Sequence, residues 1–224
     1  MKRSEIRSVL FDLDGTLLDT APDLIRVLNQ VRVEQGREPV PTAIARTQVS
    51  HGSAGLIRLG FPDLSGDPLE ALRLRLLELY SAQVAIDTAL FDGCQAVLDE
   101  LRSRDMRWGI VTNKPGFLTT PLLASLGLGE HAGCVVSGDT LPQRKPHPAP
   151  LLLAASQLAL SPAQCLYVGD AERDVQSARA AGMPVLVARY GYLSPADDPV
   201  AWGPDALIDT PTQIIDWLDG TLRA

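Results

Sequence analysis

The chain has 224 residues, about one and a half times the length of an average domain, so it has room for a compact domain that carries an insert. Hydrophobic residues make up 46% and charged residues 21%, which is typical of a folded globular protein and excludes a disordered chain. With 27 acidic residues against 20 basic ones the net charge is −7, and because no basic stripe is visible we expect no nucleic-acid partner.

Three further features restrict the class of protein. The three cysteines form no CxxC pair, which argues against a disulfide framework or a zinc site. The N-terminus reaches Asp12 after a very short apolar run, unlike a signal peptide. Residues 146–169 lack charged side chains, but four prolines interrupt them, which favours a buried helix and strand over a membrane span. We therefore expect a cytoplasmic protein with no membrane partner.

Short β-rich apolar runs alternate with helical stretches along most of the chain. The expected strands are residues 9–11, 109–111, 134–136, 166–168, 185–187 and 206–208, and the expected helices are residues 95–102, 118–126, 150–158, 175–181 and about 211–222. Such alternation predicts βαβ units around a parallel sheet. The strands are apolar throughout, which is typical of a sheet that helices cover on both faces.

Residues 19–92 break this rhythm, because they show helical periodicity without an obvious strand. The apolar positions recur on two stripes, at Leu24, Leu28 and Val31 and at Leu69, Leu72, Leu76 and Leu79. We predict a helical domain over residues 19–92, inserted after the first strand, and an α/β core domain made of residues 1–18 and 93–224.

Acidic side chains follow two of the predicted strands. Asp12 and Asp14 come after the first strand, and Asp170 comes after the fourth, with Asp174 four residues further on. In open α/β sheets ligands bind outside the carboxyl ends of the strands, so we expect these carboxylates to share one crevice. Clustered carboxylates repel one another unless they share a cation, and Mg²⁺ suits oxygen ligands beside a substrate phosphate. The sequence therefore predicts a magnesium site.

Complementary donors are available for the oxygens of a phosphate. Thr112 and Asn113 follow the second strand, and Lys145 stands ahead of a later helix. An aspartate beside them could attack phosphorus and form an aspartyl-phosphate. A second carboxyl group two residues away could protonate the leaving alkoxide and then activate water.

These residues resemble the four motifs of the haloacid dehalogenase superfamily, in the order of that family. The motifs are DLDGT at residues 12–16, Thr112, Lys145-Pro146, and Gly169-Asp170 with Asp174. The resemblance covers nearly the whole chain. It implies a Rossmann-like parallel sheet with helices on both faces and a small helical cap, inserted after the first motif, that closes over the substrate.

The resemblance also implies a role for each residue. Asp12 would be the nucleophile and Asp14 the general acid/base, while Thr112 and Lys145 would hold the phosphoryl group. Mg²⁺ would be bound by Asp12, the backbone carbonyl of Asp14 and Asp170, with Asp174 in support. Gly15, Thr16 and Asn113 complete the candidate phosphate-binding residues. One departure is Ala171, where many relatives carry a polar residue beside the metal.

Within the superfamily the chain resembles the phosphoglycolate phosphatase group and, more closely, the bacterial N-acetylmuramic acid 6-phosphate phosphatases. Residues 108–115, 145–154 and 189–203 carry this likeness. It implies a small phosphorylated metabolite with a carboxylate as substrate, either N-acetylmuramic acid 6-phosphate or 2-phosphoglycolate. Residues 50–53, which include His51, are either the loop that faces this substrate or a surface turn.

Three other functions remain as alternatives. A sugar phosphomutase uses the same motifs and a similar cap. A phospho-accepting signalling module also combines acids, threonine and lysine, but it is about half this length and has no cap. A haloacid dehalogenase needs neither Asp14 nor Mg²⁺.

Overall fold

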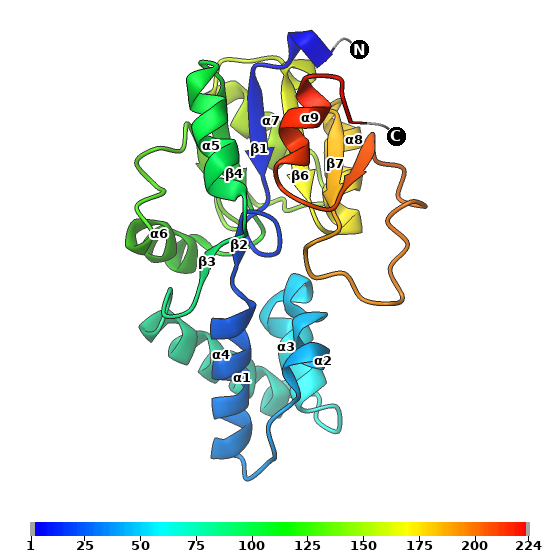
Figure 1. Ribbon diagram of the computed structural model, residues 1–224. Coiled ribbons are helices and arrows are strands. Elements are labelled where there is room, and N and C mark those ends of the chain that lie inside the picture. The colour runs from blue at the N-terminus through cyan, green and yellow to red at the C-terminus, as the bar shows by residue number, and fades with distance from the viewer. Residues whose placement is uncertain (1–2, 223–224) are drawn as a thin grey trace.

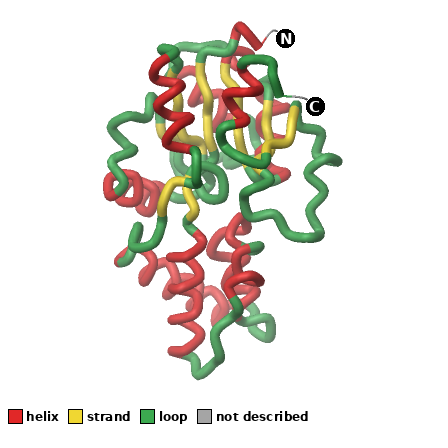
Figure 2. Tube along the Cα trace, viewed as in Figure 1, coloured by secondary structure: helices red, strands yellow, loops and turns green. Residues whose placement is uncertain are grey.

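Six parallel strands form the central sheet of the computed structural model, which describes residues 3–222 (Figures 1 and 2). In space they follow the order β5-β4-β1-β6-β7-β8. The bounds are β1 Ser8–Phe11, β4 Arg107–Val111, β5 Val135–Val136, β6 Cys165–Gly169, β7 Val185–Ala188 and β8 Ala206–Ile208. The predicted parallel α/β sheet is confirmed.

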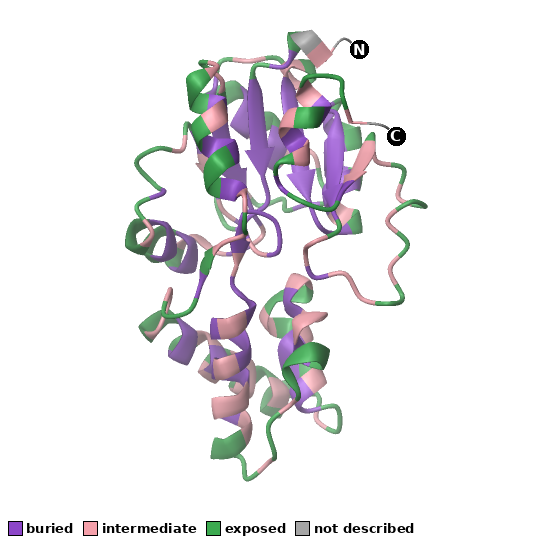
Figure 3. Ribbon diagram, in the orientation of Figure 1, coloured by how far each residue is buried: buried purple, intermediate pink, exposed green. Residues whose placement is uncertain are grey.

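Helices cover both faces of the sheet, because successive side chains of a strand point to opposite sides. Val9 and Phe11 pack in one core cluster with the helices in front of the sheet in Figure 1, while Leu10 packs with those behind it. The front helices are α5 (Cys94–Ser103) and α9 (Gln213–Leu218), and the rear helices are α7 (Ala149–Gln157) and α8 (Glu172–Ala181). Figure 3 shows the strands as the most deeply buried part of the chain.

At strand β1 the direction in which successive strands are added to the sheet reverses. After β1 the core places β4 and β5 on one side of it, and the chain then crosses over to build β6, β7 and β8 on the other. The carboxyl ends of β1, β4 and β6 are therefore neighbours, with register pairs Phe11–Ile110 and Phe11–Val168. Such a switch point leaves a crevice at which ligands bind.

Four helices form a separate group, which we call the helical unit (residues 21–82). They are α1 Ala21–Glu34, α2 Thr42–Arg46, α3 Gly52–Gly60 and α4 Gly66–Ala82. The unit has its own buried cluster around Leu28, Leu56 and Tyr80, and lies beyond the carboxyl ends of the strands in Figure 1. The two predicted leucine stripes fall on α1 and α4.

The chain passes between the core and the helical unit through two short strands, which the sequence did not predict. Strand β2 (Leu18–Asp19) pairs antiparallel with β3 (Ala89–Leu90). Two residues are too few to show a period-2 pattern, so only the pairing itself identifies them.

Asp23 on α1 fastens the returning chain just before β3. Its buried carboxylate accepts hydrogen bonds from the backbone amides of residues 86–88, from the Thr88 hydroxyl at 2.7 Å and from Arg26 at 2.6 Å. Burial alone would raise the pKa of Asp23, but these hydrogen bonds outweigh it and hold the pKa below its usual value.

Residues 146–169 form α7 and the buried strand β6, as predicted. None of the helices between residues 3 and 222 combines the length and the apolar composition needed to cross a bilayer. The last helix is shorter than the expected residues 211–222, because Gly220 with φ +77° turns the chain after Leu218.

Candidate active site

Three carboxylates meet where β1 and β6 end. Asp12 follows β1, Asp170 follows β6, and Asp174 lies in the first turn of α8. All three are buried, and one carboxylate oxygen from each lies within 4.8 Å of the others. The structure thus brings together the three predicted metal-binding carboxylates. Asp14 was expected to contribute its backbone carbonyl, and its carboxylate contacts Thr20 and Lys114 instead.

Lys145 balances the charge of this cluster. Its fully buried Nζ lies 2.9 Å from Asp12 Oδ1 and 2.8 Å from Asp174 Oδ1. It also donates a hydrogen bond of 2.7 Å to the hydroxyl of Tyr167, which donates in turn to the carbonyl of Val111. Tyr167 was not predicted, since it stands in the middle of an apolar strand.

The proton affinities reflect burial and crowding. Burial raises the pKa of Asp12 against the opposing charge of Lys145. Burial, followed by the charges of Asp12 and Asp174, raises the pKa of Asp170 to about 7. Each added negative charge therefore costs free energy here, and a cation bound among the carboxylates would relieve it.

The donor set fits a hard divalent cation. Asp170 Oδ1 is buried without a hydrogen-bond partner among residues 3–222, so one lone pair is free for a ligand. Three carboxylates offer the oxygen atoms that Mg²⁺ prefers. Ala171 contributes through its backbone, because its N–H donates to Asp174 Oδ2 at 3.1 Å whatever its side chain.

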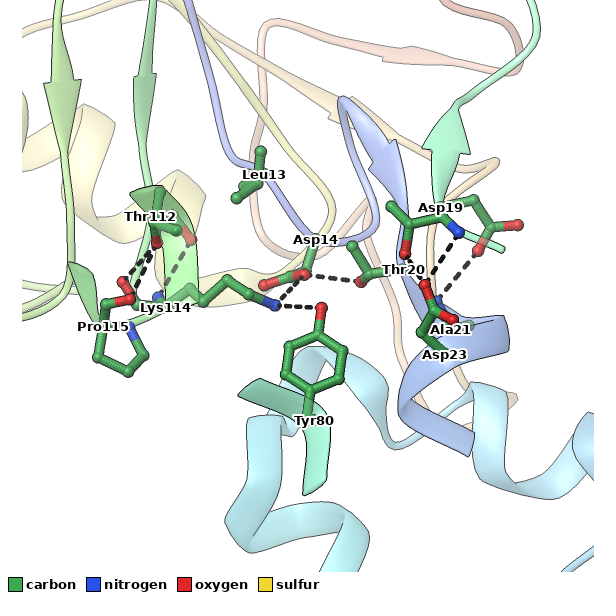
Figure 4. A network of polar contacts seen from close by, with 12 residues as sticks. Leu13, Asp14, Asp19, Thr20, Ala21, Asp23, Tyr80, Thr112, Lys114 and Pro115 are labelled. Atoms are coloured by element: carbon green, nitrogen blue, oxygen red, sulfur yellow. Dashed lines mark hydrogen bonds and ion pairs between the residues drawn. The ribbon is translucent and has the colours of Figure 1, made fainter. Parts of the chain in front are cut away.

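Asp14 belongs to a second polar network (Figure 4). Its Oδ1 accepts a hydrogen bond of 2.6 Å from the Thr20 hydroxyl and lies 3.0 Å from Lys114 Nζ. The same Nζ donates to the hydroxyl of Tyr80 on α4, at 3.0 Å. Burial alone would lower the pKa of Lys114, but Asp14 and Tyr80 together raise it above its usual value. Lys114 thus connects Tyr80 of the helical unit to Asp14, the expected general acid/base.

Asn113 and Thr112 have different surroundings. The Asn113 side chain clamps the backbone of Lys145, donating to its carbonyl at 3.0 Å and accepting from its N–H at 3.1 Å. It therefore fixes the segment that carries the lysine. Thr112 Oγ1 accepts from the N–H of Lys114 at 3.1 Å, and both Thr112 and Asn113 line the cavity described below.

Gly15 and Thr16 lie behind the site and do not line that cavity. Gly15 has φ +85°, and its backbone passes so close to Asp170 that a Cβ would lie 2.2 Å from Oδ2. Thr16 is fully buried, and its carbonyl accepts hydrogen bonds from Tyr190 and Cys94. The structure therefore leaves no room for a side chain between residue 15 and Asp170.

The loop at residues 50–53 faces the site. Ser50 donates a hydrogen bond of 2.7 Å to Asp170 Oδ2, which also accepts from the backbone N–H of Tyr192 at 3.0 Å. His51 is exposed and lines the cavity. Sequence reasoning found the loop but not the contact between Ser50 and Asp170, which depends on how the helical unit lies over the core.

Arg173 is a further residue that the sequence did not reveal. It lines the same cavity beside the carboxylates. Burial alone would lower its pKa, but the negative charges of Asp174, Asp12 and Asp170 outweigh burial and raise it. It stands between two predicted residues of one motif, so only its orientation in space sets it apart.

A cavity of about 1280 Å³ separates the helical unit from the carboxyl ends of the strands. Asp12, Asp14 and Thr112 line its core side. Loop residues 48–51 and the helices α3 and α4 line the opposite side. The site thus has polar core residues on one side and the helical unit on the other, with room between them for a bound metabolite.

Comparison with known proteins gives consistent results. A family model described as haloacid dehalogenase-like hydrolase matches residues 9–188. The phosphoglycolate phosphatase of Xanthomonas campestris pv. campestris strain 8004 is 44% identical over 208 residues, covering 93% of this chain and 94% of that protein. The N-acetylmuramic acid 6-phosphate phosphatase of Pseudomonas aeruginosa is 40% identical over 223 residues, covering 99% of each.

Among solved structures, a predicted phosphoglycolate phosphatase from Haemophilus somnus superposes with a TM-score of 0.84 at 25% identity. The match covers 95% of this chain and 98% of that one. The similarity therefore includes the helical unit as well as the sheet.

Proposed function

The chain belongs to the haloacid dehalogenase-like hydrolase family as a phosphatase, and from that premise we propose that it is a Mg²⁺-dependent phosphomonoesterase acting through an aspartyl-phosphate. One observation carries the proposal. The buried carboxylate of Asp12 lies 2.9 Å from Lys145 Nζ and within 4.8 Å of the carboxylates of Asp170 and Asp174. A nucleophile, a cation for the phosphoryl oxygens and a metal-ligand set thus share one point of the crevice.

Asp12 is the nucleophile in this reaction. One of its carboxylate oxygens attacks phosphorus while the bond to the leaving oxygen breaks, which leaves the phosphoryl group on Asp12. Lys145 stays within hydrogen-bond distance of Asp12, so it neutralises negative charge as the phosphoryl group arrives. Thr112, at the end of β4, offers a hydroxyl on the same side of the cavity.

Asp14 is the general acid and general base of this reaction. In the first half-reaction it gives a proton to the leaving alkoxide, and in the second it takes one from the water that attacks phosphorus and releases inorganic phosphate. Its hydrogen bonds to Thr20 and Lys114 hold the carboxylate in one orientation between these steps.

Mg²⁺ would be held by Asp12, the backbone carbonyl of Asp14 and Asp170, with Asp174 in support. Bound there, it would offset the negative charge of the carboxylates and of the phosphate oxygens. Ser50 and the N–H of Tyr192 fix Asp170 Oδ2, so that Oδ1 remains available to a cation.

Residues 19–92 act as a mobile cap, and residues 1–18 and 93–224 as the core domain. Two features support this division. The chain crosses between the two parts only through the β2–β3 pair. In addition, Ser50 and Tyr80 of the helical unit make hydrogen bonds to Asp170 and Lys114 of the core, so closure can complete the site.

The substrate is a small phosphomonoester with a carboxylate, either N-acetylmuramic acid 6-phosphate or 2-phosphoglycolate. The named activities of the two relatives support this class. The cavity volume of about 1280 Å³ leaves room for the larger, sugar-based compound, since it exceeds the ~300–1,000 Å³ of typical ligand pockets.

The experiment is a steady-state measurement of phosphate release from both compounds and from glucose 6-phosphate, with and without Mg²⁺. We expect metal-dependent release that Asp12→Asn abolishes. Asp209→Asn, at an exposed surface ion pair with Arg189, is the matched control and should retain full activity. Normal turnover by Asp12→Asn, or an isomeric sugar phosphate in place of inorganic phosphate, would contradict the proposal.

A further inference from the structure

Two arginines of the helical unit lie on the far side of the cavity from Asp12. Arg58 belongs to α3 and Arg73 to α4, and both line the cavity. On α3 the lining residues Ala54 and Arg58 are four apart, so they share the helix face that borders the cavity. Both arginines are therefore available to a ligand that extends across the cavity from Asp12.

The two guanidinium groups differ in how firmly they are held. Arg73 is paired with Glu70, Nη2 lying 2.5 Å from Oε1, and its Nη1 donates to Ser53 Oγ at 3.4 Å. Arg58 is exposed, and no ion pair joins it to any of the described residues. The neighbouring helices α3 and α4 thus offer the cavity one arginine that is already paired and one that is not, and both can bind an anion.

Charge is unevenly distributed around the cavity. The acidic side chains that line it are Asp12, Asp14 and Asp139, all from the core, which also contributes Lys114, Arg144 and Arg173. The helical unit contributes arginines and apolar residues such as Leu59 and Leu77, but no acidic side chain, to the part of the lining that the structure describes. Lys145 stands beside Asp12 on the core side, whereas Arg58 and Arg73 line the cavity from the helical unit, so a substrate that spans the cavity can meet both.

The position of Arg58 along α3 bears on which part of the substrate it can contact. The helix begins at Gly52, two residues after Ser50, which contacts Asp170. Arg58 lies six residues further on, about 9 Å along the helix axis at 1.5 Å per residue. Arg58 therefore lies near the end of α3 that is further from Ser50 along the chain.

The two candidate substrates differ by a matching length. At about 1.3 Å per covalent bond, the phosphorus and the carboxylate carbon are separated by ~4 Å (three bonds) in 2-phosphoglycolate and by up to ~10 Å (eight bonds) in N-acetylmuramic acid 6-phosphate. A carboxylate ~4 Å from phosphorus stays near Asp12, whereas one ~10 Å away extends towards the part of the cavity that the helical unit lines, where Arg58 lies.

We propose that Arg58, supported by Arg73 on the neighbouring helix α4, binds a carboxylate on the leaving group and thereby selects phosphomonoesters whose carboxylate lies far from the phosphorus. The inference rests on the proposed phosphatase function and adds the residues that determine specificity. A carboxylate bound to Arg58 would be shielded from water when the cap closes, which strengthens the pairing.

The test compares two substrates that differ only in the carboxylate. N-acetylglucosamine 6-phosphate has the same sugar and phosphate as N-acetylmuramic acid 6-phosphate but lacks the lactyl group. We expect Arg58→Met to lower kcat/KM for the muramic acid compound by about tenfold or more, through KM, because a charge-assisted hydrogen bond is lost. For the glucosamine compound kcat/KM should stay within about twofold, and Arg58→Lys should restore part of the discrimination.

Arg75→Met is the matched control. Arg75 also lies on α4 and pairs with Glu34 and Glu78, but it does not line the cavity. It should leave both substrates unaffected, and equal melting temperatures would show that the variants are folded.

The inference is overturned if Arg58→Met lowers both substrates equally or neither. It is also overturned if the unchanged enzyme prefers 2-phosphoglycolate or fails to distinguish the two sugars. Failure of the phosphatase function itself looks different, because the unchanged enzyme with Mg²⁺ would then release phosphate from none of the compounds.

Discussion

Replacing Gly15 with alanine perturbs the metal site without altering any carboxylate. The new Cβ would lie 2.2 Å from Asp170 Oδ2 and 2.8 Å from a ring carbon of Tyr192. Asp170 therefore has to retreat by about 0.8 Å before that contact reaches 3.0 Å. Mg²⁺ demands near-ideal geometry, and a misplacement of about 1 Å at a catalytic centre can cost about a hundredfold in rate.

Gly36→Ala is the matched control. Gly36 also has a positive φ, +66°, but nothing lies within 4 Å of its Cβ position. Both variants bear the backbone cost of a left-handed alanine, about 1–2 kcal/mol in the free energy of unfolding. Only Gly15→Ala also displaces Asp170.

The assay is kcat/KM as a function of Mg²⁺ concentration, together with the free energy of unfolding from denaturant titration. We expect Gly15→Ala to lower kcat/KM by about a hundredfold and to require more Mg²⁺, while Gly36→Ala stays within about twofold. If Gly15→Ala kept near-normal activity and Mg²⁺ affinity, or if Gly36→Ala lost as much, the reasoning would be refuted.

Three more predictions concern the hydrogen bonds around the site, the α1 anchor and the metal. Tyr80→Phe removes the hydroxyl that binds Lys114, and we expect kcat to fall about tenfold. The control Tyr190→Phe removes a hydrogen bond to the Thr16 carbonyl and should change only the stability. Equal effects of the two variants on kcat would contradict this prediction. The depressed pKa of Asp23 means that its stabilisation is present above ~pH 4, the unfolded value, and is lost as the pH falls through the lower folded pKa. Asp23→Asn should therefore lower the free energy of unfolding by about 2 kcal/mol at pH 7, with the difference from the unchanged protein shrinking below pH 4; no difference at pH 7 would refute it. Mg²⁺ should raise the melting temperature of the unchanged protein but not of Asp170→Asn, and an equal rise in both would argue against the metal site.

The sheet and the floor of the site could be predicted because their determinants are local. Apolar runs ending in polar residues place Asp12, Thr112 and Asp170 at one edge, since the carboxyl ends of parallel strands meet there. Lys145 was predicted from its motif, and its Nζ lies 2.9 Å from Asp12 Oδ1.

The contacts between the helical unit and the core could not be predicted. The hydrogen bonds from Ser50 to Asp170 and from Lys114 to Tyr80 join residues 120 and 34 positions apart. They depend on how the helical unit docks on the core, which hydrophobic periodicity does not encode. The role of Asn113 also depends on contacts that the sequence does not reveal. Its position beside Thr112 suggested a hydrogen-bond donor to the phosphate, but its side chain makes hydrogen bonds to the backbone of Lys145.

The most direct test of the central claim is mass spectrometry of enzyme quenched in acid during turnover of N-acetylmuramic acid 6-phosphate with Mg²⁺. We predict one added phosphoryl group on the peptide that contains Asp12, and none in Asp12→Asn. Rapid turnover with no phosphorylated enzyme, or a phosphoryl group on another residue, would contradict the assignment of Asp12 as the nucleophile.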